Sequence, residues 1–385
     1  MSVWQRPTRL RSAESESAER HATWFELFFD LVFALAVSQL SATLQSDTSA
    51  AGYLKFIGLF VPVWWAWVIY VTYADRFDTD DVVYRLTVML GMLAIVAMAV
   101  SLPNALSDSQ AAPFAIAYVI VRLIPLALYI HAGRSLEIGR DIAWGYGSIT
   151  VPAALLWLGG IFVPLPARYV VWALAATLEV VNPFIRRSTV ARTPVAVSHF
   201  AERFGAFTII VLGESVFSVG ATLANLSGGW HAEPAATATG AFVITAAQWW
   251  LYFDFMDGRP LRRGFAVRQV FVYAHLPIVV GITAIAAGTR LAIGDAATGT
   301  PVLHGGAVWA ICGGAALFQL ATALIHATRH SFGDWLVKDR LAVAVLLLAL
   351  GLLSASLSPF AVVGVVAVLH VVQVAAELTW HGSEA

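Results

Sequence analysis

Long apolar runs constrain this chain more than any other feature. The first lies in TWFELFFDLVFALAVSQLSATL, residues 23–44, and similar runs recur to the end of the chain. A run of about 20 apolar residues has the length of a helix that crosses a bilayer. The composition agrees, because 12% of the residues are charged, against roughly 25% in soluble domains, and the mean hydropathy is +0.76. The sequence predicts an all-α fold, a polytopic membrane helix bundle.

We count twelve apolar segments and expect each to cross the membrane once as a helix. The last two are separated only by a very short turn at residues 356–359. The expected segments are 24–44, 53–73, 85–103, 112–131, 142–163, 167–185, 203–223, 237–256, 268–289, 304–327, 340–357 and 360–379.

Basic residues predict the orientation of the segments. If the N-terminus is cytoplasmic, the opposite side holds only Lys55, Arg168 and Arg290, and Arg122 lies within a segment. The rest of the 23 Lys and Arg residues then fall on the cytoplasmic side, as the positive-inside rule requires. We expect a multi-pass protein of the inner (plasma) membrane with both termini in the cytoplasm. Residues 1–22 are polar and mix acids with bases, which favours a disordered tail over a signal peptide.

The two halves of the chain resemble each other. An even number of helices per half would make this a parallel repeat, related by an axis along the membrane normal. We therefore expect a tail at 1–22, a first six-helix repeat at 23–190 and a second at 195–380. Simple periodicity of Trp, Arg and Asp at membrane interfaces is the alternative explanation. The matching pairs are Tyr73-x-Asp75 with Tyr252-x-Asp254, IHAGR (130–134) with IHATR (325–329), Glu26 with Glu202, and Glu179 with Glu377.

Ionisable side chains inside a membrane are costly, commonly a few kcal/mol each, and this makes them candidates for function. We expect them to line a path for an ion or solute. The candidates are Glu26, Asp30, Arg122, Glu202, Arg203, Glu214, Asp254 and His275.

Two acids begin the first segment one helical turn apart. Glu26 could simply complement the helix dipole, whereas Asp30 lies among phenylalanines and leucines and is expected in a buried polar network. Glu214 lies roughly 16 Å into its segment, near the bilayer middle. It must be protonated, paired or facing water. If it is paired, its partner could be Arg122 or His275.

At the start of the same segment, Glu202 and Arg203 could pair with each other or with the other half at the cytoplasmic rim. The loop ADRFDTDDVVYR, residues 74–85, concentrates further charge. It could attract cations, lock the loop through salt bridges, or be a solvated turn. The residues considered there are Arg76, Asp78, Asp80, Asp81 and Arg85. The Trp-rich stretches at 64–67 and 248–250 are expected at membrane interfaces or in packing.

Several classes of function find no support in the sequence. There is no zinc-ligand spacing, P-loop or nucleophile elbow, so we expect no catalytic residue, no metal site, no cofactor and no enzymatic activity. The single cysteine, Cys312, excludes an intrachain disulfide. A net charge of −1 argues against nucleic acid as a partner.

Four motifs carry a resemblance to a known family. ELFFDLVFALAVSQL (26–40), RFDTDDVVYRL (76–86), ERFGAFTIIVLGESV (202–216) and QWWLYFD (248–254) are similar to the bacterial low temperature requirement A (LtrA) family. The resemblance covers about residues 22–380. The family is named for a requirement for growth in the cold, so it implies membership but no molecular activity.

The first segment also resembles a second family. FFDLVFALAVSQL (28–40) is similar to the first-helix Phe-Ser-Asp motif of two-repeat potassium channels. The resemblance implies that Asp30 helps to hold a pore-lining helix. Phe28 matches the motif's Phe, Phe29 replaces its Ser, and Ala206 occupies the corresponding Asp position in the second half.

Three hypotheses follow. The first is a permeation protein for a cation or small solute, either a channel or a secondary transporter, that uses the buried acids Asp30 and Glu214. The second is a non-transporting sensor or assembly protein for cold or stress adaptation, with a dry bundle and paired charges. The third is a membrane-embedded enzyme that modifies lipids, for which the sequence offers no nucleophile and base. The expected partners are the lipid bilayer and a small ion or solute. A homo-oligomer is an open alternative.

Overall fold

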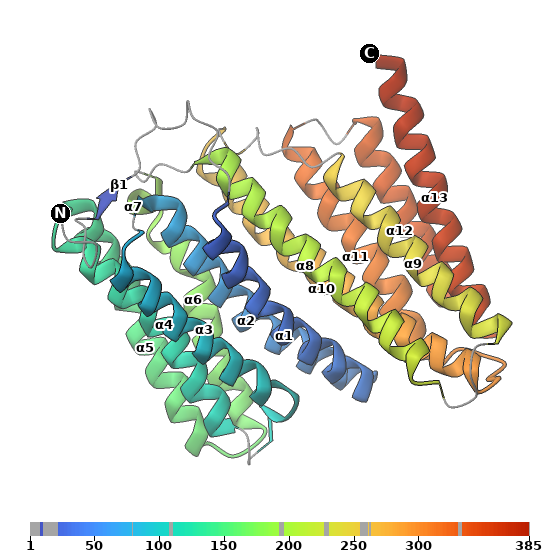
Figure 1. The fold of residues 1–385 in the computed structure, drawn as a ribbon, viewed down its shortest axis with the longest axis horizontal. Coiled ribbons are helices and arrows are strands. Elements are labelled where there is room, and N and C mark those ends of the chain that lie inside the picture. Colours follow the sequence, from blue (N-terminus) through green and yellow to red (C-terminus); the bar gives the residue numbers. More distant parts are fainter. Residues whose placement is uncertain are drawn as a thin grey trace. The chain divides into compact units, whose positions relative to one another are not determined.

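The chain forms a bundle of α-helices in the computed structural model (Figure 1). The structure describes residues 8–10, 22–78, 80–107, 111–191, 196–226, 231–254, 261, 263–329 and 333–384. Its helices are α1 (Trp24–Ser46), α2 (Ala50–Arg76), α3 (Val82–Ser101), α4 (Ala111–Gly133), α5 (Glu137–Gly159), α6 (Ala167–Ile185), α7 (Arg187–Ala191), α8 (Val197–Ala224), α9 (Ala232–Phe253), α10 (Phe265–Ala297), α11 (Gly305–Arg329), α12 (Trp335–Leu353) and α13 (Pro359–Glu384).

Every predicted segment coincides with a long helix, and α7 is a short addition of 5 residues. In the described part of the chain, 9 helices are long and apolar enough to cross a membrane, which confirms a polytopic helical membrane protein. Three of the long helices, α6, α9 and α12, are not among these nine. In α12 the charges of Lys338, Asp339 and Arg340 interrupt the apolar sequence. Twelve crossings therefore stay a prediction.

The polar N-terminal segment departs from the expected disordered tail. Within it, Arg9 and Leu10 form a two-residue strand, β1 (Arg9–Leu10). The strand pairs antiparallel with β2 (Phe77–Asp78), which follows α2 directly. In this pairing Leu10 lies opposite Phe77, and Arg9 lies opposite Asp78.

Side-chain caps fix where several helices begin. Thr23 and Glu26 form a reciprocal capping box, in which Thr23 N donates to Glu26 Oε2 over 2.8 Å and Glu26 N donates to Thr23 Oγ1 over 3.2 Å. Asp81 Oδ1 accepts from Tyr84 N at the start of α3, and Asp334 Oδ1 accepts from Leu336 N at the start of α12. These contacts satisfy backbone donors that the first helical turn leaves open.

The described chain divides into two compact units. Unit 1 comprises Met1–Leu40, Ile57–Ala206 and Leu261–Phe265, and unit 2 comprises Ser41–Phe56, Phe207–Pro260 and Ala266–Ala385. In unit 1, α3, α4, α5 and α6 pack against one another in chain order (Figure 1). In unit 2, α11 packs along α12 and α13 packs along α9.

Unit 2 has a core of small and branched apolar side chains, among them Ile285, Ala315 and Leu347. The small residues allow helices α10 and α11 to approach closely. A Cβ atom at Gly281 would lie 2.5 Å from the carbonyl oxygen of Gly314. Such close approach through glycine is typical of helix packing in membranes.

We predict that Gly281→Leu destabilises the protein by about 3 kcal/mol, because a larger side chain must push α10 away from α11. Thermal unfolding in detergent measures the effect. Gly294→Leu is the matched control on the same helix, since nothing lies within 4 Å of a Cβ there. Equal losses in the two variants would show that the close helix contact is not what the glycine provides.

Candidate functional site: a buried charge cluster

Asp30 and Arg203 form a buried ion pair between α1 and α8. Arg203 Nε donates to Asp30 Oδ2 over 2.9 Å, and Nη2 donates to Oδ1 over 2.6 Å. Arg203 is 1% exposed and Asp30 is fully buried. Two parallel N–H···O bonds from one guanidinium are the strongest form of this contact. Of the two pairings considered for Arg203, the structure shows the one with the other half of the chain, through Asp30.

A group of aromatic side chains packs beside Asp30. Trp67 Nε1 on α2 donates a hydrogen bond to Asp30 Oδ1 over 2.8 Å. The Trp67 ring stacks on Trp64, with 4.9 Å between centroids, and meets Phe204 edge-on at the same separation. Asp30 thus lies in a buried polar network, as the sequence predicts. Trp67 is part of this network, and Trp64 packs against it.

Glu26 and His199 extend the network by one helical turn. Glu26 Oε1 lies 3.4 Å from Arg203 Nη1 and 3.3 Å from His199 Nε2. The other ring nitrogen of His199, Nδ1, lies 3.3 Å from Asp75 Oδ1 at the end of α2. Asp75 Oδ2 also accepts from the backbone of Ala196 over 3.3 Å. We call Glu26, Asp30, Asp75, His199 and Arg203 the charge cluster; all five lie in unit 1.

Acids outnumber bases in the charge cluster. Three carboxylates meet one guanidinium and one imidazole, and each of the five side chains is buried. Burial makes an uncompensated charge costly, so such a group draws in a proton or another cation. Glu26 and Arg203 also line a small cavity of about 10 Å³, close to the smallest volume that holds one water molecule.

A second buried ion pair lies between α4 and α6 of unit 1. Arg122 Nε donates to Glu179 Oε1 over 2.6 Å, and the hydroxyl of Tyr118 donates to Glu179 Oε2. The Arg122 guanidinium also lies over the ring of Tyr146, 5.3 Å from its centroid. Arg122 is therefore the counter-ion of Glu179 and not of Glu214, contrary to the pairing considered from the sequence.

A third buried pair lies in unit 2. Arg340 Nη2 on α12 donates to Glu377 Oε2 on α13 over 2.9 Å and to the carbonyl of Leu251 over 3.0 Å. Gln373 Nε2 donates to Glu377 Oε1 over 3.3 Å and to Gln319 Oε1 on α11 over 3.1 Å. The matched acids Glu179 and Glu377 thus both hold a buried arginine, although the arginine comes from a different helix in each half.

The remaining predicted path residues, Glu214, Asp254 and His275, belong to unit 2. Glu214 is half-buried on α8, and Asp254 is exposed just after α9. His275 Nε2 accepts from the Tyr252 hydroxyl over 2.8 Å, and its Nδ1 donates to the carbonyl of Phe271 over 2.6 Å. Both nitrogens of His275 therefore have hydrogen-bond partners within unit 2.

The charged loop after α2 has several separate roles. Asp80 accepts two hydrogen bonds from Arg85, over 2.7 and 2.8 Å, in an exposed ion pair. Asp81 caps α3, and Asp78 takes part in the strand pairing through its backbone. Arg76 ends α2 and is buried. Asp80 and Arg85 thus form an exposed ion pair in this loop.

Three members of the network were not recognised as site candidates in the sequence. His199 precedes Arg203 by one turn, as Glu26 precedes Asp30, and this matched spacing is the signal that points to the cluster. The sequence pattern places Asp75 in the charged loop and Trp67 in a stretch typical of interface or packing residues. Among the residues that the structure describes, no three His, Cys, Asp or Glu side chains are grouped to hold a metal ion.

We predict that Arg203→Met destabilises the protein by roughly 3–5 kcal/mol, because it leaves the Asp30 carboxylate buried without its counter-ion. Adding Asp30→Asn to the same chain should recover part of this loss. Thermal unfolding of the two single variants and the double variant measures the coupling. Arg85→Met is the control, since its ion pair with Asp80 is exposed and a much smaller effect is expected. Strictly additive losses at Asp30 and Arg203 would contradict the ion pair.

One family model matches most of this chain. The sequence model described as Bacterial low temperature requirement A protein (LtrA) matches residues 21–375. An uncharacterized protein of Rhizobium meliloti (strain 1021) is 29% identical over 311 residues, which cover 71% of this chain and 73% of the relative. The family match spans α1 to α13 and includes every residue of the charge cluster.

Proposed function

The chain belongs to the bacterial low temperature requirement A family of multi-pass membrane proteins, and from this premise we propose that it is a permeation protein for a cation. The term covers a channel and a secondary transporter alike. A small neutral solute carried together with a cation would fit the same proposal.

The excess of buried acid in the charge cluster is the observation that carries this proposal. Intramembrane ionisable groups are retained where they serve an ion or proton path. Arg203 pairs with Asp30 and also lies 3.4 Å from Glu26, and Glu26 and Asp75 share His199 between them. A cation that reaches this end of α1 and α8 therefore meets more negative than positive charge.

The proposed architecture is twelve crossings in two parallel six-helix repeats with both termini in the cytoplasm. The twelve long helices at the predicted positions support it. The buried acids Glu179 and Glu377, near the ends of α6 and α13, give further support, because each ends its half with an internal ion pair. In this arrangement the charge cluster lies at the cytoplasmic ends of α1, α2 and α8.

A path through the protein would combine the charge cluster with Glu214. The half-buried Glu214 lies three turns beyond Arg203 on the same helix, α8. Glu26 would be the first acid that an entering ion meets, and Asp30 the first that it meets within the bundle. In this proposal Arg122, Asp254 and His275 are not part of the path.

A non-transporting sensor or assembly protein is the second candidate. The ion pairs Arg122–Glu179 and Arg340–Glu377 favour it, because both are buried and each lies within one unit. An enzyme is not proposed, since neither the sequence nor the described clusters offer a nucleophile beside a base.

We predict cation flux in proteoliposomes that hold the purified wild-type protein under K⁺, Na⁺ or H⁺ gradients. Glu26→Gln and Glu214→Gln should each lower the flux at least tenfold, because each removes a negative charge from the path. A tenfold change corresponds to about 1.4 kcal/mol in the barrier. Asp80→Asn is the matched control, since Asp80 is exposed in the loop and outside the path.

Unchanged flux in the Glu26 and Glu214 variants would show that the path does not use these acids. No wild-type flux under any of the three gradients would contradict cation permeation and favour the sensor or assembly role. Size-exclusion chromatography and thermal unfolding of each variant separate lost flux from lost folding.

A further inference from the structure

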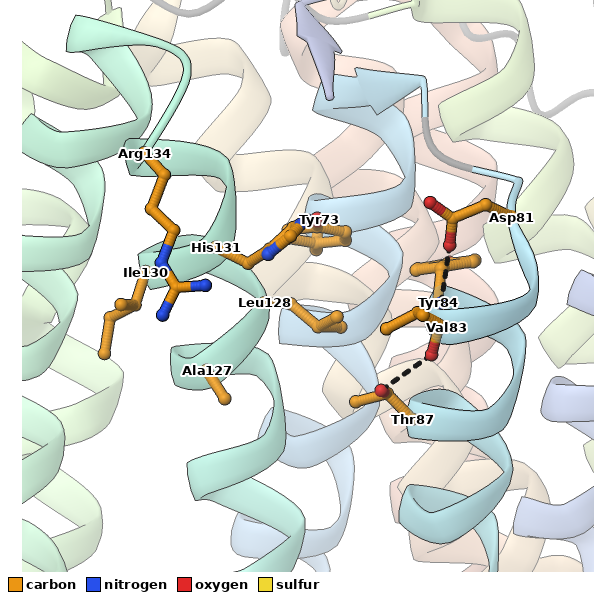
Figure 2. A pocket seen from close by; sticks show the side chains of 10 residues that line it. All are labelled: Tyr73, Asp81, Val83, Tyr84, Thr87, Ala127, Leu128, Ile130, His131 and Arg134. Atoms are coloured by element: carbon orange, nitrogen blue, oxygen red, sulfur yellow. Dashed lines mark hydrogen bonds between the residues drawn. The ribbon is translucent and has the colours of Figure 1, made fainter. Parts of the chain in front are cut away.

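A cavity of about 320 Å³ opens in unit 1, between the start of α3 and the end of α4. Figure 2 shows His131 and Arg134 on the α4 side and Asp81, Tyr84 and Thr87 on the α3 side. The predicted path does not include this cavity, and neither the proposed function nor the family match assigns it a ligand.

The two sides of the cavity carry opposite charge. Arg134 follows the last turn of α4 and is exposed, and among the described residues it makes no ion pair with a carboxylate. His131 lies one turn earlier and is half-buried. On the other side, Asp81 is a buried acid that caps α3. A ligand that fits both sides must carry an anionic and a cationic group.

A hydroxyl and two aromatic rings beside Asp81 can also contact a cationic group. Thr87 Oγ1 donates to the Val83 carbonyl over 2.7 Å (Figure 2), so the hydroxyl oxygen still accepts a hydrogen bond. The rings of Tyr73 and Tyr84 stack, with 6.0 Å between centroids. Aromatic faces attract ammonium groups.

Apolar surface continues from the cavity along both helices. Ala127, Leu128 and Ile130 line its α4 side, and Val83 lines its α3 side. Leu86 and Leu90 on α3 and Leu123 on α4 are large apolar side chains that stay exposed nearby. In a membrane, such surface contacts acyl chains, while a polar cavity at a helix end lies at the level of the lipid headgroups.

We propose that this cavity binds a phosphatidylethanolamine molecule, with its phosphate on Arg134 and His131 and its ammonium on Asp81 and Thr87. Ethanolamine carries three N–H donors, which a carboxylate and a hydroxyl oxygen accept. Choline lacks these donors. An anionic glycerol headgroup has no positive group to place beside Asp81, which would repel it.

Native mass spectrometry of the purified full-length protein tests the proposal with phosphatidylethanolamine, phosphatidylcholine and phosphatidylglycerol of identical acyl chains. The wild-type protein should retain phosphatidylethanolamine at least tenfold better than either of the others. Arg134→Gln and Asp81→Asn should each reduce this retention about tenfold. Asparagine also caps helices well, so Asp81→Asn removes the charge and keeps the start of α3.

Arg140→Gln and Asp80→Asn are the matched controls, because neither residue lines the cavity, and both should leave retention unchanged. Equal or better retention of phosphatidylglycerol in the wild-type protein would overturn the proposal in favour of a simple anion site. Equal retention of phosphatidylcholine would overturn it in favour of non-specific lipid contact. The lipid comparison needs no variant to fold and does not depend on cation flux, so it can fail separately from the proposed function.

Discussion

The ion pair between Asp30 and Arg203 is the contact on which the first unit most depends. Two charged groups without water are stable only when each satisfies the other. Here Arg203 donates two hydrogen bonds, and Trp67 donates a third to the same carboxylate. The contact joins helices α1, α2 and α8, and α8 enters unit 1 only through its first turns. The other members of the charge cluster take their positions around this pair.

The same physics explains the sites elsewhere in the bundle. Arg122 with Glu179 is a buried pair of one acid and one base. The charge cluster differs because three carboxylates share one guanidinium and one imidazole. A balanced pair holds helices together, whereas an acid surplus also attracts a cation. This difference separates a structural contact from a candidate for transport within one protein.

The sequence predicts the helices well, because apolar runs and capping residues act locally. The range 167–185 for α6 matches at both ends, and Thr23 with Glu26 marks the start of α1. The choice of ionic partner was predicted poorly, since it depends on which helix faces reach one another. Depth along the segments allows Arg122 or His275 beside Glu214, whereas Arg122 pairs with Glu179 in the structure. Asp75 lies within a charged run, and its burial beside His199 has no local signal.

The most direct test of this account is the cation flux of the double variant Glu26→Gln with Asp75→Asn in proteoliposomes. These substitutions remove the two carboxylates that share His199 and keep the ion pair between Asp30 and Arg203. The account predicts a folded protein without flux, because the cluster no longer holds more acids than bases. Wild-type flux from the folded double variant would contradict the central claim that the acid surplus at this cluster serves cation permeation.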